Sequence, residues 1–244
     1  MGLGAKKSKS KSKGAPRGLL ARPLDSLVFL LPLIVFYEVV CLLPGAPGWG
    51  AAGERVVAFQ LLQVFFELFG ATYVWLPGLA VVVILLATHL VSRQPWRVRG
   101  RSVGWMYVEA VGWAMPLIAV NHVTRMAAGY LPEYSWVSQA AISVGAGVYE
   151  ELVFRLILIS VLVVVGADLL RFSQDTTLVA AVFISAVLFA LHHHPPFGGE
   201  PFGAARFVFR SMAGVYLGAI FVFRGYGPAA GAHLAHNLIV LGMG

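Results

Sequence analysis

Charged residues are scarce in this chain of 244 residues. Only 12% of the residues are charged and 59% are hydrophobic, whereas a soluble domain of this size would carry about 25% charged residues. No polar stretch is long enough to form a separate soluble domain. The alternating polar and apolar pattern of a membrane β-barrel is also missing. These absences predict an all-α, polytopic helical membrane protein.

Other features that would indicate particular functions are also missing. The single cysteine, Cys41, excludes a disulfide within the chain and says nothing about redox compartment. The sequence contains no HExxH motif, which would place two zinc ligands one helical turn apart. It has no internal repeat and no pair of broken helices, which are typical of many secondary transporters.

Long apolar runs predict where the chain crosses the membrane. The run at 55–70 is short and contains Glu67, so we expect it to lie in the interface or to re-enter the membrane. The architecture expected is about seven or eight transmembrane helices that enclose an intramembrane polar site. The longer apolar runs cover residues 24–44, 72–92, 104–122, 146–168, 177–194, 205–224 and 228–243.

Basic residues are concentrated at the N-terminus, namely Lys6, Lys7, Lys9, Lys11, Lys13, Arg17 and Arg22. We expect residues 1–22 to be a disordered tail that binds anionic lipid, at roughly 1 kcal/mol per basic residue near the surface. Nucleic-acid binding is not expected, because no basic fold follows the tail. The tail predicts a cytoplasmic N-terminus. The span at 24–44 resembles a signal peptide, but it is long and contains Glu38, so we expect it to remain as an anchor.

A second basic segment helps to orient the remaining helices. It contains Arg93, Arg97, Arg99 and Arg101, and two crossings after the tail would return it to the cytoplasmic side. Continuing the count places the C-terminus outside. His193 would then lie near the outer face although His233 lies early in a helix that starts inside, so a shared site requires a cavity that reaches the middle of the membrane.

Nearly all candidate polar groups lie in the C-terminal part of the chain. This asymmetry predicts three regions, which are the basic tail at 1–22, an accessory membrane region at 23–102 and a catalytic membrane core at 103–244. Gly214 and Gly218 form a small-xxx-small pair, which predicts close packing of their helix against another.

The first polar motif is Glu-Glu-Leu-Val-Phe-Arg at residues 150–155, inside an apolar run. Charges near the centre of a membrane helix cost about 2.5–3.5 kcal/mol each, so their presence indicates a use. Glu151 and Arg155 are four residues apart, which predicts an ion pair. Glu150 then points about 100° away and is left to act as a base. The simpler alternative is that all three residues only hold helices together.

Two further polar motifs follow. His192, His193 and His194 precede Pro195, which ends the span, and their side chains spread by about 100° per residue, so at most two of them can face one site. An interfacial polar cap is the alternative reading. In the last span, His233 and Asn237 share a helix face and can stabilise an oxyanion. Hydrogen bonding between helices is the alternative there.

The three motifs together resemble those of the CAAX-protease and bacteriocin-processing (CPBP, or Abi) family of glutamate-dependent intramembrane endopeptidases. The family pattern is EExxxR, FxxxH and HxxxN, each on its own helix. This chain has Glu150-Glu151-xxx-Arg155, Phe189-xxx-His193 and His233-xxx-Asn237. The resemblance covers about residues 103–244. His192 and His194 flank the matching histidine, His193. Residues 1–100 carry no motif of a recognisable family.

The resemblance implies a mechanism without a cofactor or a metal. Glu150 and His193 would activate a water that attacks a peptide carbonyl, and His233 and Asn237 would hold the oxyanion. Glu151 and Arg155 would be structural or orienting. The substrate would be a membrane-associated protein or peptide, such as a prenylated CAAX protein, a leader peptide or a C-terminal sorting tail. We also expect an integral protein of the bacterial plasma membrane, of unspecified oligomeric state.

Three alternative functions remain open. In a zinc-dependent intramembrane protease, Glu150, His193 and His233 would ligate the metal. A transporter or proton relay would use intramembrane ionisable groups. An immunity protein would retain the fold without catalysis. The relay would extend through Glu38, Glu109, His89 and His122.

Overall fold

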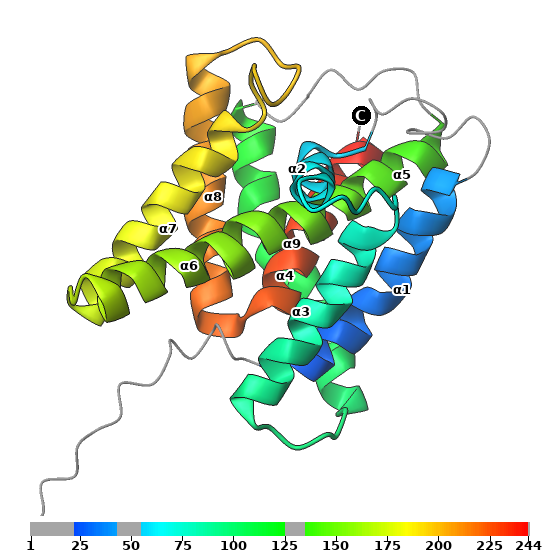
Figure 1. Cartoon of the computed structure of the whole chain (residues 1–244). Coiled ribbons are helices and arrows are strands. Elements are labelled where there is room, and N and C mark those ends of the chain that lie inside the picture. The colour runs from blue at the N-terminus through cyan, green and yellow to red at the C-terminus, as the bar shows by residue number, and fades with distance from the viewer. Residues whose placement is uncertain (1–21, 43–54, 125–134, 244) are drawn as a thin grey trace, which may run out of the picture.

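The computed structural model describes residues 22–42, 55–124 and 135–243, and all regular structure within these ranges is helical (Figure 1). The predicted all-α class is therefore confirmed. The basic tail, apart from Arg22, lies outside the described residues. The elements are α1 (Pro23–Leu42), α2 (Val57–Glu67), α3 (Leu76–Ser92), α4 (Gly100–Thr124), α5 (Trp136–Gly145), η1 (Ala146–Glu150), η2 (Leu152–Ile159), α6 (Ser160–Val163), η3 (Val164–Leu169), α7 (Gln174–Leu191), α8 (Ala204–Arg224) and α9 (Tyr226–Met243).

Five helices among the described residues are long and apolar enough to cross a membrane, fewer than the seven or eight expected. They are α1, α4, the continuous helix from α5 to η3, α7 and α8. Helices α2 and α3 are apolar but shorter. Helix α9 was expected as a span, but His233, His236 and Asn237 lower its hydropathy. With 11 residues, α2 is too short to span a bilayer, and Figure 1 views it nearly along its axis while α1 and α3 run lengthwise.

The run expected at 146–168 is only the C-terminal part of a longer helix. This helix spans Trp136–Leu169 and begins at Ser135, whose Oγ accepts a hydrogen bond from the Ser138 N–H. Its first turns contain serine and glutamine, so the apolar pattern alone does not mark them. From Ala146 onward much of it has π-helical geometry, which is frequent at functional sites. Both glutamates of the first motif therefore lie in or beside a widened helical turn.

Helix α9 lies among the other helices and contacts α1, α4, α5, α8 and η1. Its approach to η1 is very close at Gly147, where a Cβ atom would lie 2.9 Å from Leu234 Cβ and 3.0 Å from the Ala230 oxygen. A side chain at residue 147 would therefore separate the glutamates from the histidines of α9.

Helices α7 and α8 also pack closely, as Gly214 and Gly218 predict. A Cβ at Gly214 would lie 2.9 Å from Ala186 Cα, and one at Gly218 would lie 2.9 Å from Val182 Cγ1. The small side chains of α8 thus let the α7 backbone approach. This contact positions the end of α7, where the histidines follow.

Polar contacts tie together one end of the helix bundle. The Arg99 N–H donates to Asp25 Oδ1 at 3.2 Å, and Gly227 N–H donates to Ser26 Oγ at 3.3 Å. The starts of α1, α4 and α9 therefore lie at the same end, and α7 ends at the opposite one (Figure 1). The second basic segment and Arg22, which joins the tail to α1, therefore lie at the same end of the bundle, where Arg22 donates to Ser102 Oγ at 3.2 Å.

A second polar cluster connects α1 with the long helix. Tyr149 O–H donates to Glu38 Oε1 at 2.6 Å, and Arg55 Nη1 lies 3.1 Å from Glu38 Oε2. The rings of Tyr37 and Phe59 pack against that of Tyr149, with centroids 5.2 and 5.0 Å away. Glu38, whose place in a span the apolar pattern left unexplained, is thus neutralised by Arg55 and hydrogen-bonded to the residue that precedes Glu150.

Candidate active site

The predicted ion pair between Glu151 and Arg155 is present and is fully buried. Arg155 Nε lies 3.2 Å from Glu151 Oε2, and neither side chain is exposed to solvent. Arg155 also donates to the Gly214 carbonyl at 3.4 Å, and its guanidinium carbon lies 4.2 Å from the centre of the Phe189 ring. One guanidinium thus connects the long helix with α7 and α8.

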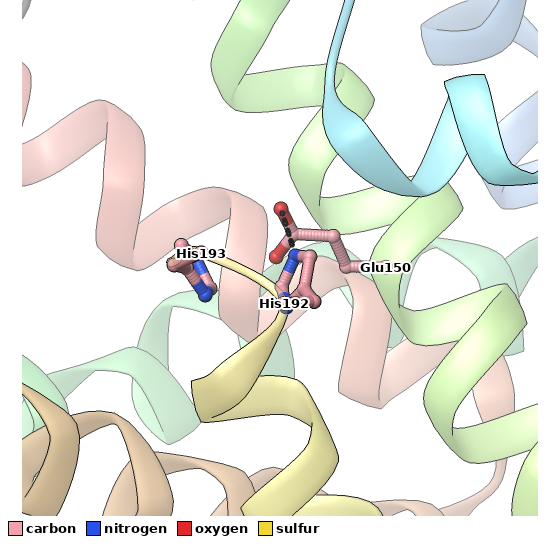
Figure 2. Close-up of side chains that lie close together, drawn as sticks. All are labelled: Glu150, His192 and His193. Atoms are coloured by element: carbon pink, nitrogen blue, oxygen red, sulfur yellow. Dashed lines mark ion pairs between the residues drawn. The ribbon is translucent and has the colours of Figure 1, made fainter. Parts of the chain in front are cut away.

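Glu150 points away from that pair, as its helical position predicts, and faces three histidines. Its Oε1 lies 3.5 Å from His192 Nε2, and its Oε2 lies 3.8 Å from His233 Nε2. Figure 2 shows the carboxylate directed at the His192 ring, with His193 beside it. The imidazoles of His192 and His193, which follow α7, and that of His233 on α9 therefore meet around the buried Glu150 carboxylate.

His192 and His193 are both held by the carbonyl of Phe189. The Nδ1–H of each ring donates to this oxygen, at 2.9 Å for His193. Because α7 ends at Leu191, both rings can reach one acceptor. His194 turns elsewhere and donates through Nδ1 to the Glu200 carbonyl at 3.0 Å. The expectation that at most two of these histidines face one site is confirmed, but the spacing from Phe189 missed His192.

On α9, hydrogen bonds determine which N–H groups of His233 and Asn237 remain available as donors. His233 Nδ1 donates to Glu151 Oε1 at 2.9 Å, so Nε2 becomes a donor when the ring carries both protons. His236 Nδ1 donates to Asn237 Oδ1 at 3.0 Å, which turns the Asn237 N–H groups to the opposite side of the amide. His236 was not predicted, although its position beside Asn237 is the signal that would have found it.

A cavity of about 700 Å³ brings the predicted residues together. Glu150, His193, His233 and Asn237 all line it. The shared cavity that the sequence required is therefore present, and its lining comes from the long helix, the end of α7 and α9. Hydrophobic side chains of α4 and α8 form much of the remaining wall.

Glu200 and Arg210 add an unpredicted ion pair to the same wall. Glu200 accepts two hydrogen bonds from Arg210, at 2.7 and 2.8 Å. Partial burial alone would raise the pKa of Glu200, but the hydrogen bonds and charge of Arg210 outweigh it and lower that pKa. Burial also lowers the pKa of His193, to about 3, so its imidazole is neutral at neutral pH.

The residues of the proton-relay alternative are not gathered at this cavity, with one exception. Glu38 is bound to Arg55, Glu109 is paired with Arg224, and His89 packs against the Trp96 ring at 4.4 Å between centroids. His122 does line the cavity. Glu38, Glu109 and His89 thus have separate local partners, and His122 alone of the four lines the cavity.

The metal-binding alternative has a different ligand set from the one expected. Ligand atoms of Glu150, His192 and His193 lie within 4.8 Å of one another. His192 thus takes the place predicted for His233, whose Nδ1 is held by Glu151.

Residues 132–239 match a family model described as type II CAAX prenyl endopeptidase Rce1-like. Neither a curated protein nor a solved structure matches the chain. The matched segment contains all three motifs, and the resemblance that they indicated is confirmed. With five helices in the described part of the chain long and apolar enough to cross a membrane, the protein is an integral membrane protein. Over residues 132–239 the chain is thus similar to the Rce1-like family, which is a family of proteases.

Proposed function

We propose that the protein is a CAAX-type intramembrane endopeptidase in which Glu150 and His193 activate a water molecule. The observation that carries this proposal is the cavity of about 700 Å³ lined jointly by Glu150, His193, His233 and Asn237. A carboxylate and a neutral imidazole beside the same enclosed space are the groups needed to take a proton from water.

Each catalytic group has a defined part in the proposed reaction. Water donates one hydrogen bond to the Glu150 carboxylate and another to Nε2 of His193, whose Nδ1–H is held by the Phe189 carbonyl. As the water oxygen bonds to the peptide carbonyl carbon, its proton passes to Glu150. Glu150 then gives that proton to the departing amine as the peptide C–N bond breaks.

The negative charge formed on the carbonyl oxygen would be stabilised from α9. The N–H groups of the Asn237 amide are suitable donors, because His236 holds the amide oxygen. His233 contributes its Nε2–H when its ring is doubly protonated, since Nδ1 is bound to Glu151. Donors fixed in place before the reaction lower the barrier more than mobile ones. Glu151 and Arg155 serve as positioning residues.

The proposed substrate is a membrane-associated protein or peptide, and the matched family favours one with a prenylated CAAX-type end. The largely apolar cavity walls suit a lipid-modified chain that enters from the bilayer. We also propose that the enzyme lies in a bacterial plasma membrane with a cytoplasmic N-terminus, where its basic tail binds anionic lipid.

His193→Ala is expected to be inactive, whereas His192→Ala and His194→Ala keep substantial activity. His193 lines the cavity, while the His192 ring packs against Phe154 with centroids 4.7 Å apart. Turnover of a prenylated CAAX-type peptide by purified variants in vesicles measures this. An inactive His192→Ala alongside an active His193→Ala would show that the assigned register is wrong.

Removing metals is expected to leave activity intact. Because Glu150 and His193 act on water directly, the enzyme should withstand extensive treatment with chelators and contain less than one zinc per chain. Turnover and elemental analysis of the same sample measure this. Stoichiometric zinc whose removal reversibly abolishes turnover would instead establish the zinc-protease alternative, for which Glu150, His192 and His193 offer a set of ligands.

A further inference from the structure

The imidazoles of His192 and His193 face the Glu150 carboxylate. The distances between their ligand atoms are close to those between neighbouring ligand atoms in a metal site. In a tetrahedral zinc site with bonds of about 2.0–2.2 Å, neighbouring ligand atoms lie roughly 3.4 Å apart. Glu150 Oε1 and His192 Nε2 are already 3.5 Å apart. His193 completes a set whose ligand atoms all lie within 4.8 Å of one another (Figure 2). Small side-chain rotations would therefore bring three ligands around one ion.

The Phe189 carbonyl prepares both histidines for such binding. Metal-ligating histidines almost always donate their second ring N–H to a carbonyl or carboxylate, which fixes the tautomer and the ring orientation. The Nδ1 atoms of His192 and His193 both donate to this oxygen. In the neutral ring this hydrogen bond leaves Nε2 as the nitrogen with the lone pair, which is the form that binds a metal.

We propose that Glu150, His192 and His193 form a binding site for a divalent transition-metal ion and that the bound ion inhibits the enzyme. Imidazole and carboxylate ligands suit Zn²⁺ and Co²⁺. Glu151 is neutralised by Arg155, which leaves Glu150 as the carboxylate that can balance the charge of the ion. This inference rests on the proposed function, because it concerns the same carboxylate.

The bound ion would inhibit the enzyme because the other nearby carboxylates, Glu151 and Glu200, are already paired and cannot replace Glu150. In zinc metalloproteases of the HExxH type, a glutamate that is not a zinc ligand acts as the general base. Once Glu150 is a ligand, it can no longer accept the proton of water. Glu151 is held by Arg155 and His233, and Glu200 is bound by Arg210 through two hydrogen bonds. Neither carboxylate can therefore replace Glu150 as the general base.

Metal binding is tested first, without reference to activity. Chelator-treated protein in detergent is titrated with Zn²⁺ by calorimetry and with Co²⁺ by visible absorption. Wild type and the matched control His194→Ala should bind one ion, whereas His192→Ala should bind at least about tenfold more weakly. Equal affinity in wild type and His192→Ala, or no binding by wild type, would overturn the site.

Inhibition is then tested by turnover of a prenylated CAAX-type peptide. Zn²⁺ should inhibit wild type and His194→Ala at the concentrations that fill the site, and a chelator should reverse the effect. His192→Ala should require at least about tenfold more Zn²⁺ for the same fractional inhibition. Activation of the chelator-treated enzyme by Zn²⁺ would overturn both the inhibitory site and the metal-free mechanism. Unchanged turnover at a filled site would overturn the inhibitory role alone.

Discussion

Glu150→Gln is expected to abolish peptide cleavage in a protein that still folds. Loss of a general base lowers turnover by about 10²–10⁴-fold, because the glutamine amide cannot accept the proton of water. Folding should survive, since the neighbours of Glu150 are histidines at 3.5 and 3.8 Å, whereas the buried guanidinium pairs with Glu151. Turnover of a prenylated peptide in vesicles and the thermal unfolding midpoint in detergent measure the two effects.

Glu200→Gln provides a matched control for this result. Glu200 is a second carboxylate on the wall of the same cavity, but Arg210 holds both of its oxygens. Its substitution should leave most turnover in place. Full activity in purified Glu150→Gln would remove Glu150 from the mechanism, and loss of folding in that variant would show that its carboxylate is structural.

Glu151→Gln is expected to cause a large loss of stability. Breaking a buried ion pair by removing one partner costs about 3–5 kcal/mol, because the other charge stays buried without compensation. Arg155 is completely buried, and Glu151 is its ion-pair partner as well as the acceptor of the His233 Nδ1–H. The free energy of unfolding in detergent, compared with that of wild type, measures this loss.

The double variant Glu151→Gln/Arg155→Met separates the charge effect from a packing effect. Replacing both members of a buried pair by uncharged groups is often nearly neutral, so the double variant should regain much of the stability that Glu151→Gln loses. An unfolding free energy for Glu151→Gln equal to that of wild type would contradict the assignment. A double variant even less stable than the single one would indicate that packing of Arg155 on Phe189 dominates.

The helical class and the order of the helices could be predicted from the sequence, because apolar runs in a chain this poor in charge have few other structures available. The start of the long helix at Trp136 could not, since Ser138, Gln139 and Ser143 interrupt its apolar pattern. Five of the described helices are long and apolar enough to cross a membrane, and the larger number expected is not confirmed. Helix α9 has the length of a span but carries the polar groups of the site and lies among other helices.

The ion pair of Glu151 and Arg155 and the separate direction of Glu150 followed from helical spacing, which survives the π-helical geometry. The position of His192 did not follow, because the motif spacing from Phe189 selects His193, whereas at the end of α7 the rings of both His192 and His193 reach the Phe189 carbonyl. Contacts between distant segments, such as those of Glu200 with Arg210 and of His233 with Glu151, depend on tertiary packing. Sequence spacing carries no information about them.

The hydrogen bond from Tyr149 to Glu38 has a consequence for how this protein can be divided. The family match begins at residue 132, yet the residue that precedes Glu150 is held by a carboxylate of α1, which Arg55 neutralises in turn. A fragment cut after residue 102 would retain every proposed catalytic group but would leave a buried phenol without its acceptor. We therefore expect the smallest autonomous enzyme to be larger than the matched segment, so that grafting this segment onto another membrane anchor would require Glu38 and Arg55 to be transferred with it.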